Sequence, residues 1–531
     1  MKAFTEPLLS LAGFEEMTKT AEKSSGLISV TGCIDAQKSQ MIYAFGGHRK
    51  NKLIVTFGEQ KAKELYDEYS FFDKEVVYYP SKDVLFYQSD IRGNLLTAER
   101  IRALKAIHEQ ESVTLVTTFD ALMNTMAPIE KMWENVLTLE QGQLLDLKEI
   151  QAALIRMGYE KEYQVQTMGQ FSVRGGILDV FPLTEENPIR IELWGDEIDT
   201  IRYFDCESQK SIENIDRVSI YPAAELVLSD EEKAGGIEKL KAEAKRVSDK
   251  LRKQMKTEEA HRVTVMADEL TEEWGELSMY AGMDAFLSYF FDERVGLLDY
   301  FKPSDSLIFF DELTRCTEQG KLTETEFSES MKQRLAMGYI LPGQMNGLFT
   351  EKEIVAKLEK YSCIALGALD NKANGLHQLG SYGIHCQSVS PYNNSFELLI
   401  KDLKRYKKNG YRVILLSGSR TRAKRLSEDI TDQGITCFYT ENYDHELFEG
   451  QIMVCYGKVR RGFEYPILKF AVITESDIFG AQQKKKKRHR TYEGEKIQSF
   501  TDLSVGDYVV HENHGPVSYT HLRAHETEAD L

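Results

Sequence analysis

Gly32-Cys33-Ile34-Asp35-Ala36-Gln37-Lys38-Ser39 is the stretch that decides the fold, because it has the spacing of a Walker A phosphate-binding loop. It follows a short apolar run at 26–31 and precedes a helical pattern at 36–45. In such a loop, glycines allow backbone N–H groups to point at phosphates. Gln37 stands where the second glycine is required, and its side chain obstructs that turn. We therefore predict a degenerate P-loop formed by Gly32, Gln37, Lys38 and Ser39, with a competent ATP site and a coincidental match as alternatives.

Strand and helix signals alternate through residues 1–135. Apolar runs at 52–57, 75–79 and 112–118 indicate strands, and amphipathic or charged helical patterns separate them. Strands that alternate with helices predict a parallel sheet covered on both faces. We assign residues 1–135 to the first part of an α/β domain.

A different pattern occupies residues 136–225. Strands and turns dominate, and Gly175-Gly176 lies between two short apolar runs, which predicts a hairpin. We predict a small, mainly antiparallel α+β domain inserted into the α/β domain. Exposed arginine beside an aromatic side chain is typical of an interface, although solvated strand charges are the alternative. The candidate interface residues are Lys161, Arg174, Phe181, Arg190 and Arg202.

Alternating α/β character returns after this domain. Residues 226–390 are assigned to the rest of the first α/β module, and residues 391–480 to a further small α/β domain. Residues 481–496 contain a run of lysine and arginine without hydrophobic periodicity, which predicts a basic linker. Residues 497–515 alternate around a Gly-Asp turn and predict the start of a β-rich domain.

Asp311 and Glu312 follow a buried apolar run and resemble a Walker B motif. In a working motor the aspartate supports Mg²⁺ and the glutamate positions water, whereas an ordinary strand end is the alternative. The sequence contains neither G-x-S-x-G nor H-E-x-x-H. We therefore predict no catalytic residues and no metal site.

Composition excludes several classes of protein. The 531 residues carry 66 Lys and Arg against 84 Asp and Glu, a net charge of −18, which excludes a uniform basic coat but not a local basic patch. No apolar run approaches the ~20 residues of a membrane helix, and acidic residues and proline interrupt the start, so a cytoplasmic location is expected. The seven cysteines are scattered without a C-x-x-C pair, which favours reduced thiols.

Four segments together resemble a known family. The runs GQFSVRGGILDVFP (169–182) and IRIELWGDEI (189–198) are similar to the excision-nuclease subunit UvrB and, more closely, to the bacterial transcription-repair-coupling factors (Mfd). The runs VITESDIFG (472–480) and LSVGDYVVHENHG (503–515) resemble the coupling factors specifically. The resemblance covers nearly all of residues 1–515, in family order, and residues 516–531 depart from it as a non-family tail.

The resemblance implies that the chain is the N-terminal, UvrB-like portion of a coupling factor, truncated at the start of the RNA-polymerase-interacting domain. The first α/β module would be a degenerate RecA-like (P-loop NTPase-like) fold without ATPase activity. Residues 136–225 would be the UvrA-interaction domain and would bind UvrA near Lys161, Arg174 and Phe181.

Residues 497–515 would open a CarD-like or Tudor-like domain that docks on the RNA polymerase β subunit, near Val505, Asp507 and Tyr508. In the family, a motor that uses ATP and Mg²⁺ to translocate on double-stranded DNA follows. This chain carries no motifs of that motor, so no cofactor is expected in it, and the truncation leaves polymerase binding by this chain open.

The function expected from these observations is a non-catalytic adaptor in transcription-coupled nucleotide excision repair, which recruits UvrA. The enzymatic alternative is an ATP-binding helicase or ATPase in its own right, against which Gln37 argues. A third reading, a transcription-factor fragment that acts only through 505–515, is weak because so short a piece cannot bury a core.

Overall fold

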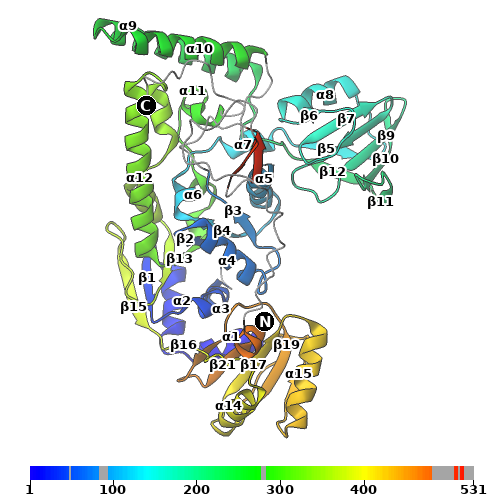
Figure 1. Ribbon diagram of the computed structural model, residues 1–531, viewed down its shortest axis with the longest axis vertical. Helices are drawn as coiled ribbons and strands as arrows, with labels where there is room; N and C mark the ends of the chain where they lie inside the picture. The colour runs from blue at the N-terminus through cyan, green and yellow to red at the C-terminus, as the bar shows by residue number, and fades with distance from the viewer. Residues whose placement is uncertain (47–48, 83–93, 277–282, 481–507, 512–514, 519–531) are drawn as a thin grey trace.

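The computed structural model describes residues 1–46, 49–82, 94–276, 283–480, 508–511 and 515–518. It confirms an α/β chain built on a parallel sheet of seven strands. In spatial order the strands are β15 (Gln378–Gly383), β1 (Gly26–Thr31), β14 (Ser362–Leu366), β13 (Ser306–Asp311), β2 (Asn51–Thr56), β4 (Thr114–Thr118) and β3 (Val77–Tyr79). Strands from both ends of residues 26–383 therefore lie side by side in one sheet (Figure 1).

Helices cover both faces of this sheet, which is why its strands are apolar at successive positions. In β2, Leu53 and Val55 pack into one core and Ile54 into the other. One face is covered by α1 (Lys2–Leu9), α2 (Phe14–Lys23), α3 (Asp35–Phe45) and α4 (Glu59–Tyr69). The opposite face is covered by α5 (Asn94–Glu109), α6 (Phe119–Met123), α7 (Ile129–Trp133), α12 (Leu313–Ala336) and α13 (Glu351–Leu358).

A small β domain interrupts this module between α7 and β13 and lies to one side of it (Figure 1). Its six-stranded sheet has the order β11 (Ser211–Ile215), β10 (Glu197–Phe204), β9 (Ile189–Trp194), β8 (Ile177–Val180), β7 (Gln170–Arg174) and β6 (Glu160–Lys161). All its strand pairs are antiparallel except β6 with β7. The turn at Gly175 and Gly176 joins β7 to β8 as predicted. The helix α8 (Leu147–Arg156) and the pair β5 (Leu137–Glu140) and β12 (Arg217–Ile220) complete the domain.

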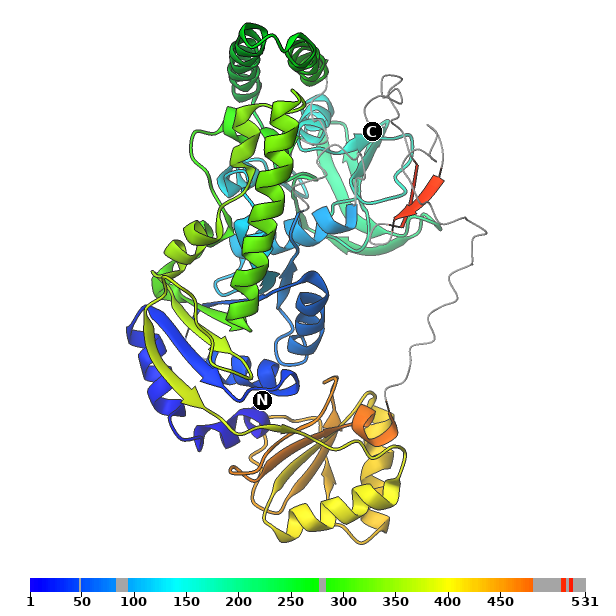
Figure 2. The same cartoon turned by 60° about the vertical axis from the view of Figure 1, so that its left-hand side comes forward.

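Two long helices form an antiparallel hairpin at one end of the molecule (Figures 1 and 2). They are α9 (Asp230–Lys253) and α10 (Thr257–Glu276). A capping box between Ser229 and Glu232 begins α9, because each side chain hydrogen-bonds the other's backbone N–H. The base of the hairpin packs around Trp274 with the short helix α11 (Leu287–Phe290).

A second α/β sheet lies at the opposite end of the molecule (Figures 1 and 2). Its strand order is β16 (Gln387–Ser388), β20 (Phe463–Tyr465), β21 (Phe470–Thr474), β17 (Arg412–Ser417), β19 (Ile452–Tyr456) and β18 (Phe438–Tyr439). The helices α14 (Phe396–Lys408), α15 (Arg420–Asp432) and α16 (Glu475–Phe479) accompany it. Val413 and Leu415 pack into its own core, whereas Ile414 and Leu416 belong to the core that includes α1, α3 and α4. The two sheets therefore share one apolar core.

The last described elements are β22 (Tyr508–His511) and β23 (Gly515–Ser518), which pair antiparallel. The strand β23 begins at Gly515, the last residue of the expected block, and runs to Ser518, with Pro516 and Val517 opposite Val510 and Val509. The predicted basic linker, 481–496, lies outside the described residues. Within the described residues, no helix has the length and hydropathy needed to cross a lipid bilayer.

Candidate functional site

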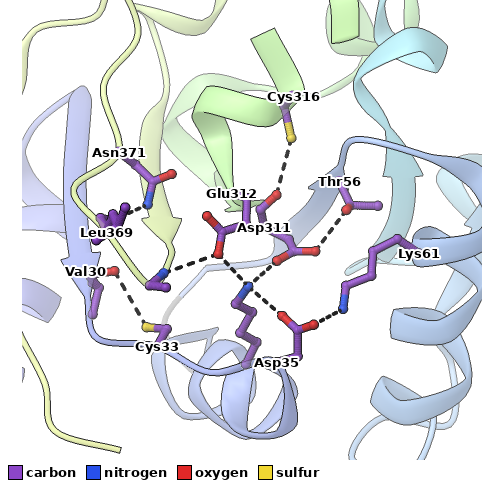
Figure 3. A network of polar contacts seen from close by, with 12 residues as sticks. Val30, Cys33, Asp35, Thr56, Lys61, Asp311, Glu312, Cys316, Leu369 and Asn371 are labelled. Carbon is purple, nitrogen blue, oxygen red and sulfur yellow. Dashed lines mark hydrogen bonds and ion pairs between the residues drawn. The ribbon is translucent and has the colours of Figure 1, made fainter. Parts of the chain in front are cut away.

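The loop after β1 and the first turns of α3 carry the predicted P-loop residues, and the side chain of Lys38 on α3 is buried. The side chain of Lys38 is 1% exposed, and its ammonium contacts three carboxylates. Its Nζ donates to Asp311 Oδ1 at 2.5 Å, to Asp35 Oδ1 at 2.9 Å and to Glu312 Oε1 at 3.2 Å. Figure 3 shows Asp35, Asp311 and Glu312 turned toward one point. The structure thus joins the P-loop lysine to the Walker B-like pair.

Neighbouring groups fix this cluster. Thr56 at the end of β2 donates to the second oxygen of Asp311 at 2.9 Å, and Lys61 on α4 donates to the second oxygen of Asp35 at 2.8 Å. Glu312 has a left-handed backbone, φ 60°, which turns the chain from β13 into α12. The cluster is therefore built from the carboxyl ends of two adjacent strands, the start of α3 and one residue of α4.

The charges of the cluster stabilise one another. Burial by itself would lower the pKa of Lys38, but the adjacent carboxylates of Asp311 and Asp35 raise that pKa above its ordinary value. Burial would raise the pKa of Asp35, but Lys61 and Lys38 lower it to about 2. Lys38 is therefore an ammonium and Asp35 a carboxylate at neutral pH.

The backbone N–H groups of the loop are also engaged within the protein. Gly32 N–H donates to the carbonyl of Ala368 at 3.2 Å, and Cys33 N–H donates to that of Gly367 at 3.0 Å. Gly32 has a φ of 77°, and a Cβ there would lie 2.1 Å from the carbonyl oxygen of Ile384. The chain that follows β14 therefore packs where a phosphate would approach a working loop. These residues do not fit a bound nucleoside triphosphate with Mg²⁺.

Gln37, which replaces the glycine, contacts the second α/β sheet. Its Oε1 accepts a hydrogen bond from the hydroxyl of Tyr465 at 3.1 Å, and Gln40 Oε1 lies 3.3 Å from the same hydroxyl. Tyr465 and both glutamines are buried. Gln37 Nε2 and Ser39 Oγ are buried without a hydrogen-bond partner among the described residues. The glycine-to-glutamine change thus supplies a contact between the two sheets, which the sequence did not reveal.

In the small β domain, a charged row crosses the outer face of the sheet. Asp179 on β8 is buried and accepts hydrogen bonds from Arg190 Nε at 2.7 Å and Arg174 Nη2 at 2.8 Å. Arg174 keeps 36% of its side chain exposed. Asp179 lies opposite Arg190 in the ladder between β8 and β9. The buried carboxylate therefore holds two arginines on the face of the sheet.

The other three residues predicted for this surface lie differently. Arg202 on β10 donates to Glu192 Oε2 on β9 at 3.1 Å. Lys161 is exposed on the edge strand β6 and donates to Gln151 Oε1 at 2.8 Å. Phe181 is only 8% exposed, so it is a buried side chain and not an exposed aromatic anchor. Trp194, at the end of β9, is 84% exposed instead. The signal for it is the alternation of β9, in which Ile189 and Ile191 are buried, so the residue at 194 shares the outer face with Arg190.

The residues predicted to contact RNA polymerase cannot be placed in a site. Val505 and Asp507 lie outside the described residues, and only the backbone of Tyr508 is described, in β22. Their role stays a prediction.

The first similarity to known proteins lies in the small β domain. Residues 137–226 match the family model of the UvrB interaction domain. Over most of its length, the chain is similar to transcription-repair-coupling factors. It is 29% identical to that of Bacillus subtilis (strain 168) over 469 residues, which is 88% of this chain and 39% of the relative.

Two further relatives give the same result. The transcription-repair-coupling factor of Staphylococcus haemolyticus (strain JCSC1435) is 28% identical over 504 residues, 93% of this chain and 42% of the relative. That of Staphylococcus epidermidis (strain ATCC 12228 / FDA PCI 1200) is 29% identical over 504 residues with the same coverage. The chain spans about two fifths of the length of these curated relatives.

Proposed function

We propose that this chain is the UvrA-docking portion of a transcription-repair-coupling factor, a non-catalytic adaptor in nucleotide excision repair. In the whole protein, other regions would engage stalled RNA polymerase and double-stranded DNA in the cytoplasm, using ATP and Mg²⁺. The observation that carries the proposal is the UvrB interaction domain at residues 137–226. The outer face of its sheet carries charged and aromatic side chains that can bind another protein.

The docking face combines fixed charge with an exposed aromatic. The buried carboxylate of Asp179 orients the guanidinium groups of Arg174 and Arg190, so little side-chain entropy is lost when a partner binds them. Trp194 offers a large apolar surface on the same face. Arginine and tryptophan are the residues most often responsible for binding energy at protein interfaces.

The non-catalytic part of the proposal is supported by the P-loop. Lys38, the residue that would contact the β and γ phosphates, is fully engaged by three carboxylates. An incoming triphosphate would have to displace these carboxylates and would meet their negative charge. The ATPase alternative therefore requires a rearrangement of a buried ion cluster.

The test is binding of purified UvrA to the chain, measured by calorimetry. We expect Trp194→Ala and Arg174→Glu each to weaken binding at least tenfold, since they remove the aromatic surface and reverse an interface charge. Phe448→Ala, which truncates an exposed aromatic in the loop between β18 and β19, should leave the affinity unchanged. Circular dichroism must show each variant folded. Wild-type affinity in both the Trp194 and Arg174 variants would place the UvrA contact elsewhere.

A further inference from the structure

The C-terminal half of α9 carries a concentration of positive charge in an acidic chain. Residues 239–256 contain eight basic side chains and only two acidic ones, although the whole chain has a net charge of −18. All eight basic residues are exposed: Lys239, Lys241, Lys245, Arg246, Lys250, Arg252, Lys253 and Lys256. Cations in the last turn of a helix are explained by the helix dipole, but that effect is confined to the last turn. Lys239, Lys241, Lys245 and Arg246 lie before it.

These side chains form stripes along the outer face of the hairpin. Lys239, Arg246, Lys250 and Lys253 are spaced i, i+7, i+11 and i+14, which places them on one side of a helix. At 1.5 Å per residue, this stripe is about 21 Å long. The buried positions Leu240, Ala244 and Leu251 lie on the other side, against α10 and the hairpin base. The basic face therefore points away from the protein.

Few of these charges are neutralised by the chain itself. Lys239 pairs with Asp292 at 2.9 Å and Arg246 with Glu243 at 2.8 Å. The other six form no ion pair with any described carboxylate. The surface is thus strongly positive and open.

The hairpin holds this surface in a fixed position. Ser248 on α9 donates to the carbonyl of Ala260 on α10 at 3.0 Å. Gly236 lies directly against the ring of Phe290, and Arg262 on α10 donates to the carbonyl of Met337 at 3.2 Å, after α12. At the tip, Met255 has a φ of 65° and its N–H closes the turn on Arg252. The hairpin is therefore a rigid scaffold for the basic side chains, and it lies at one end of the molecule (Figures 1 and 2).

We propose that the exposed face formed by the C-terminal half of α9 and the turn that follows it, residues 239–256, binds the phosphate backbone of double-stranded DNA without sequence preference. Lysine and arginine along one face of a helix are the electrostatic footprint of nucleic-acid binding. A membrane surface is disfavoured because the apolar side of α9 is already packed against α10. Single-stranded nucleic acid is disfavoured because residues 239–256 contain no aromatic side chain on which bases could stack. A protein partner is disfavoured because Met255 is the one large apolar side chain exposed on this face.

The test is fluorescence anisotropy of a labelled duplex of about 30 base pairs with the full chain, between about 50 and 200 mM salt. The variant Lys245→Glu/Lys250→Glu/Lys253→Glu reverses three charges on α9. The matched control Lys401→Glu/Lys404→Glu/Lys408→Glu makes the same charge change on exposed lysines of α14, at the opposite end of the molecule (Figure 1). Both variants retain the basic run at 484–490.

We expect the α9 variant to raise the dissociation constant at least tenfold. The slope of log K against log salt concentration should become less negative by about 0.9 for each phosphate that the variant no longer neutralises. The α14 control should stay within twofold of wild type, and the α9 variant should bind UvrA normally. No duplex binding by the wild-type chain at low salt would overturn the proposal. Equal losses of affinity in the two variants, unchanged binding in the α9 variant, or tighter binding of the single strand than of the duplex would also overturn it.

Discussion

Lys38 Nζ lies 2.5 Å from Asp311 Oδ1, and each of the two side chains is 1% exposed. The two residues are 273 positions apart in the sequence: Lys38 lies on α3, which follows β1, and Asp311 ends β13 of the same sheet. A lysine and an aspartate at these positions would bind phosphate and Mg²⁺ in a working site. Here they neutralise each other, which is how the chain tolerates a buried charge of each sign.

Replacing Lys38 with methionine should destabilise the fold. The variant leaves Asp311 buried without its cation, which costs about 3–5 kcal/mol of unfolding free energy. The double variant Lys38→Met/Asp311→Leu should recover most of this stability because both charges are gone. Urea denaturation measures both values. Lys61→Met is the control, since Lys61 contacts the 69% exposed Asp35 and its removal should cost under about 1 kcal/mol.

Adding ATP and Mg²⁺ should leave the melting temperature of the chain unchanged. A ligand that binds the native state at 100 times its dissociation constant stabilises it by about 2.7 kcal/mol, so binding would be visible in a thermal scan. The ion cluster around Lys38 predicts no such shift. Stabilisation by the nucleotide that disappears in Lys38→Ala would show that the loop still binds phosphates.

Tyr465→Phe should weaken the contact between the two sheets. The variant removes one buried hydroxyl, and with it the hydrogen bonds to Gln37 and Gln40, at a cost of about 1–3 kcal/mol because the two amide oxygens remain buried. Hydrogen exchange should show faster exchange in α3. Tyr439→Phe, whose hydroxyl bonds the side chain of Glu441 at the surface, should change stability by less than about 0.5 kcal/mol. Equal effects of the two substitutions would argue against this contact.

The buried carboxyl of Glu68 should make the free energy of unfolding fall as the pH rises toward neutrality. Burial raises the pKa of this carboxyl from 4.5 to about 7, against the lowering effects of Arg460 and Lys61. The folded state therefore binds a proton that the unfolded state releases, and stability is lost as the pH rises from about 4.5 to about 7. Glu68→Gln should be more stable than wild type by up to about 3 kcal/mol above pH 7 and equal to it near pH 4. Denaturation at several pH values checks this, with Glu64→Gln as the nearby control.

Two adjacent glycines of α9 should respond oppositely to alanine. A Cβ at Gly236 would lie 2.2 Å from the ring of Phe290, so Gly236→Ala should destabilise the hairpin by about 1–3 kcal/mol. A Cβ at Gly235 would meet no atom within 4 Å, so Gly235→Ala should stabilise the helix by about 0.5–1 kcal/mol. Thermal denaturation distinguishes the two. A drop in stability in both variants would mean that α9 packs differently.

The parallel sheet and the β7–β8 hairpin could be predicted because their signals are local. Apolar runs alternate with helical patterns in the first case, and Gly175-Gly176 marks the turn in the second.

The site was predicted less completely, because its key contacts are tertiary. The sequence identified Lys38, Asp311 and Glu312 separately, but their pairing depends on the order β1-β14-β13 in the sheet. It gave no sign that Tyr465 reaches Gln37. Trp194 was overlooked, although the alternation of β9 places it on the exposed face of the sheet. Phe181 was expected to be exposed, but the side chain is buried by packing.

The core shared by the two sheets limits where the chain can be cut into stable fragments. Ile414, Leu416 and Met453 of the second sheet are buried together with Phe4 and Met41 of the first module. A recombinant fragment that ends near residue 390 would leave this apolar surface in water and invite aggregation. Fragments meant for crystallisation or for partner screening should therefore run past Gly480, so that limited proteolysis and melting report a single cooperative unit.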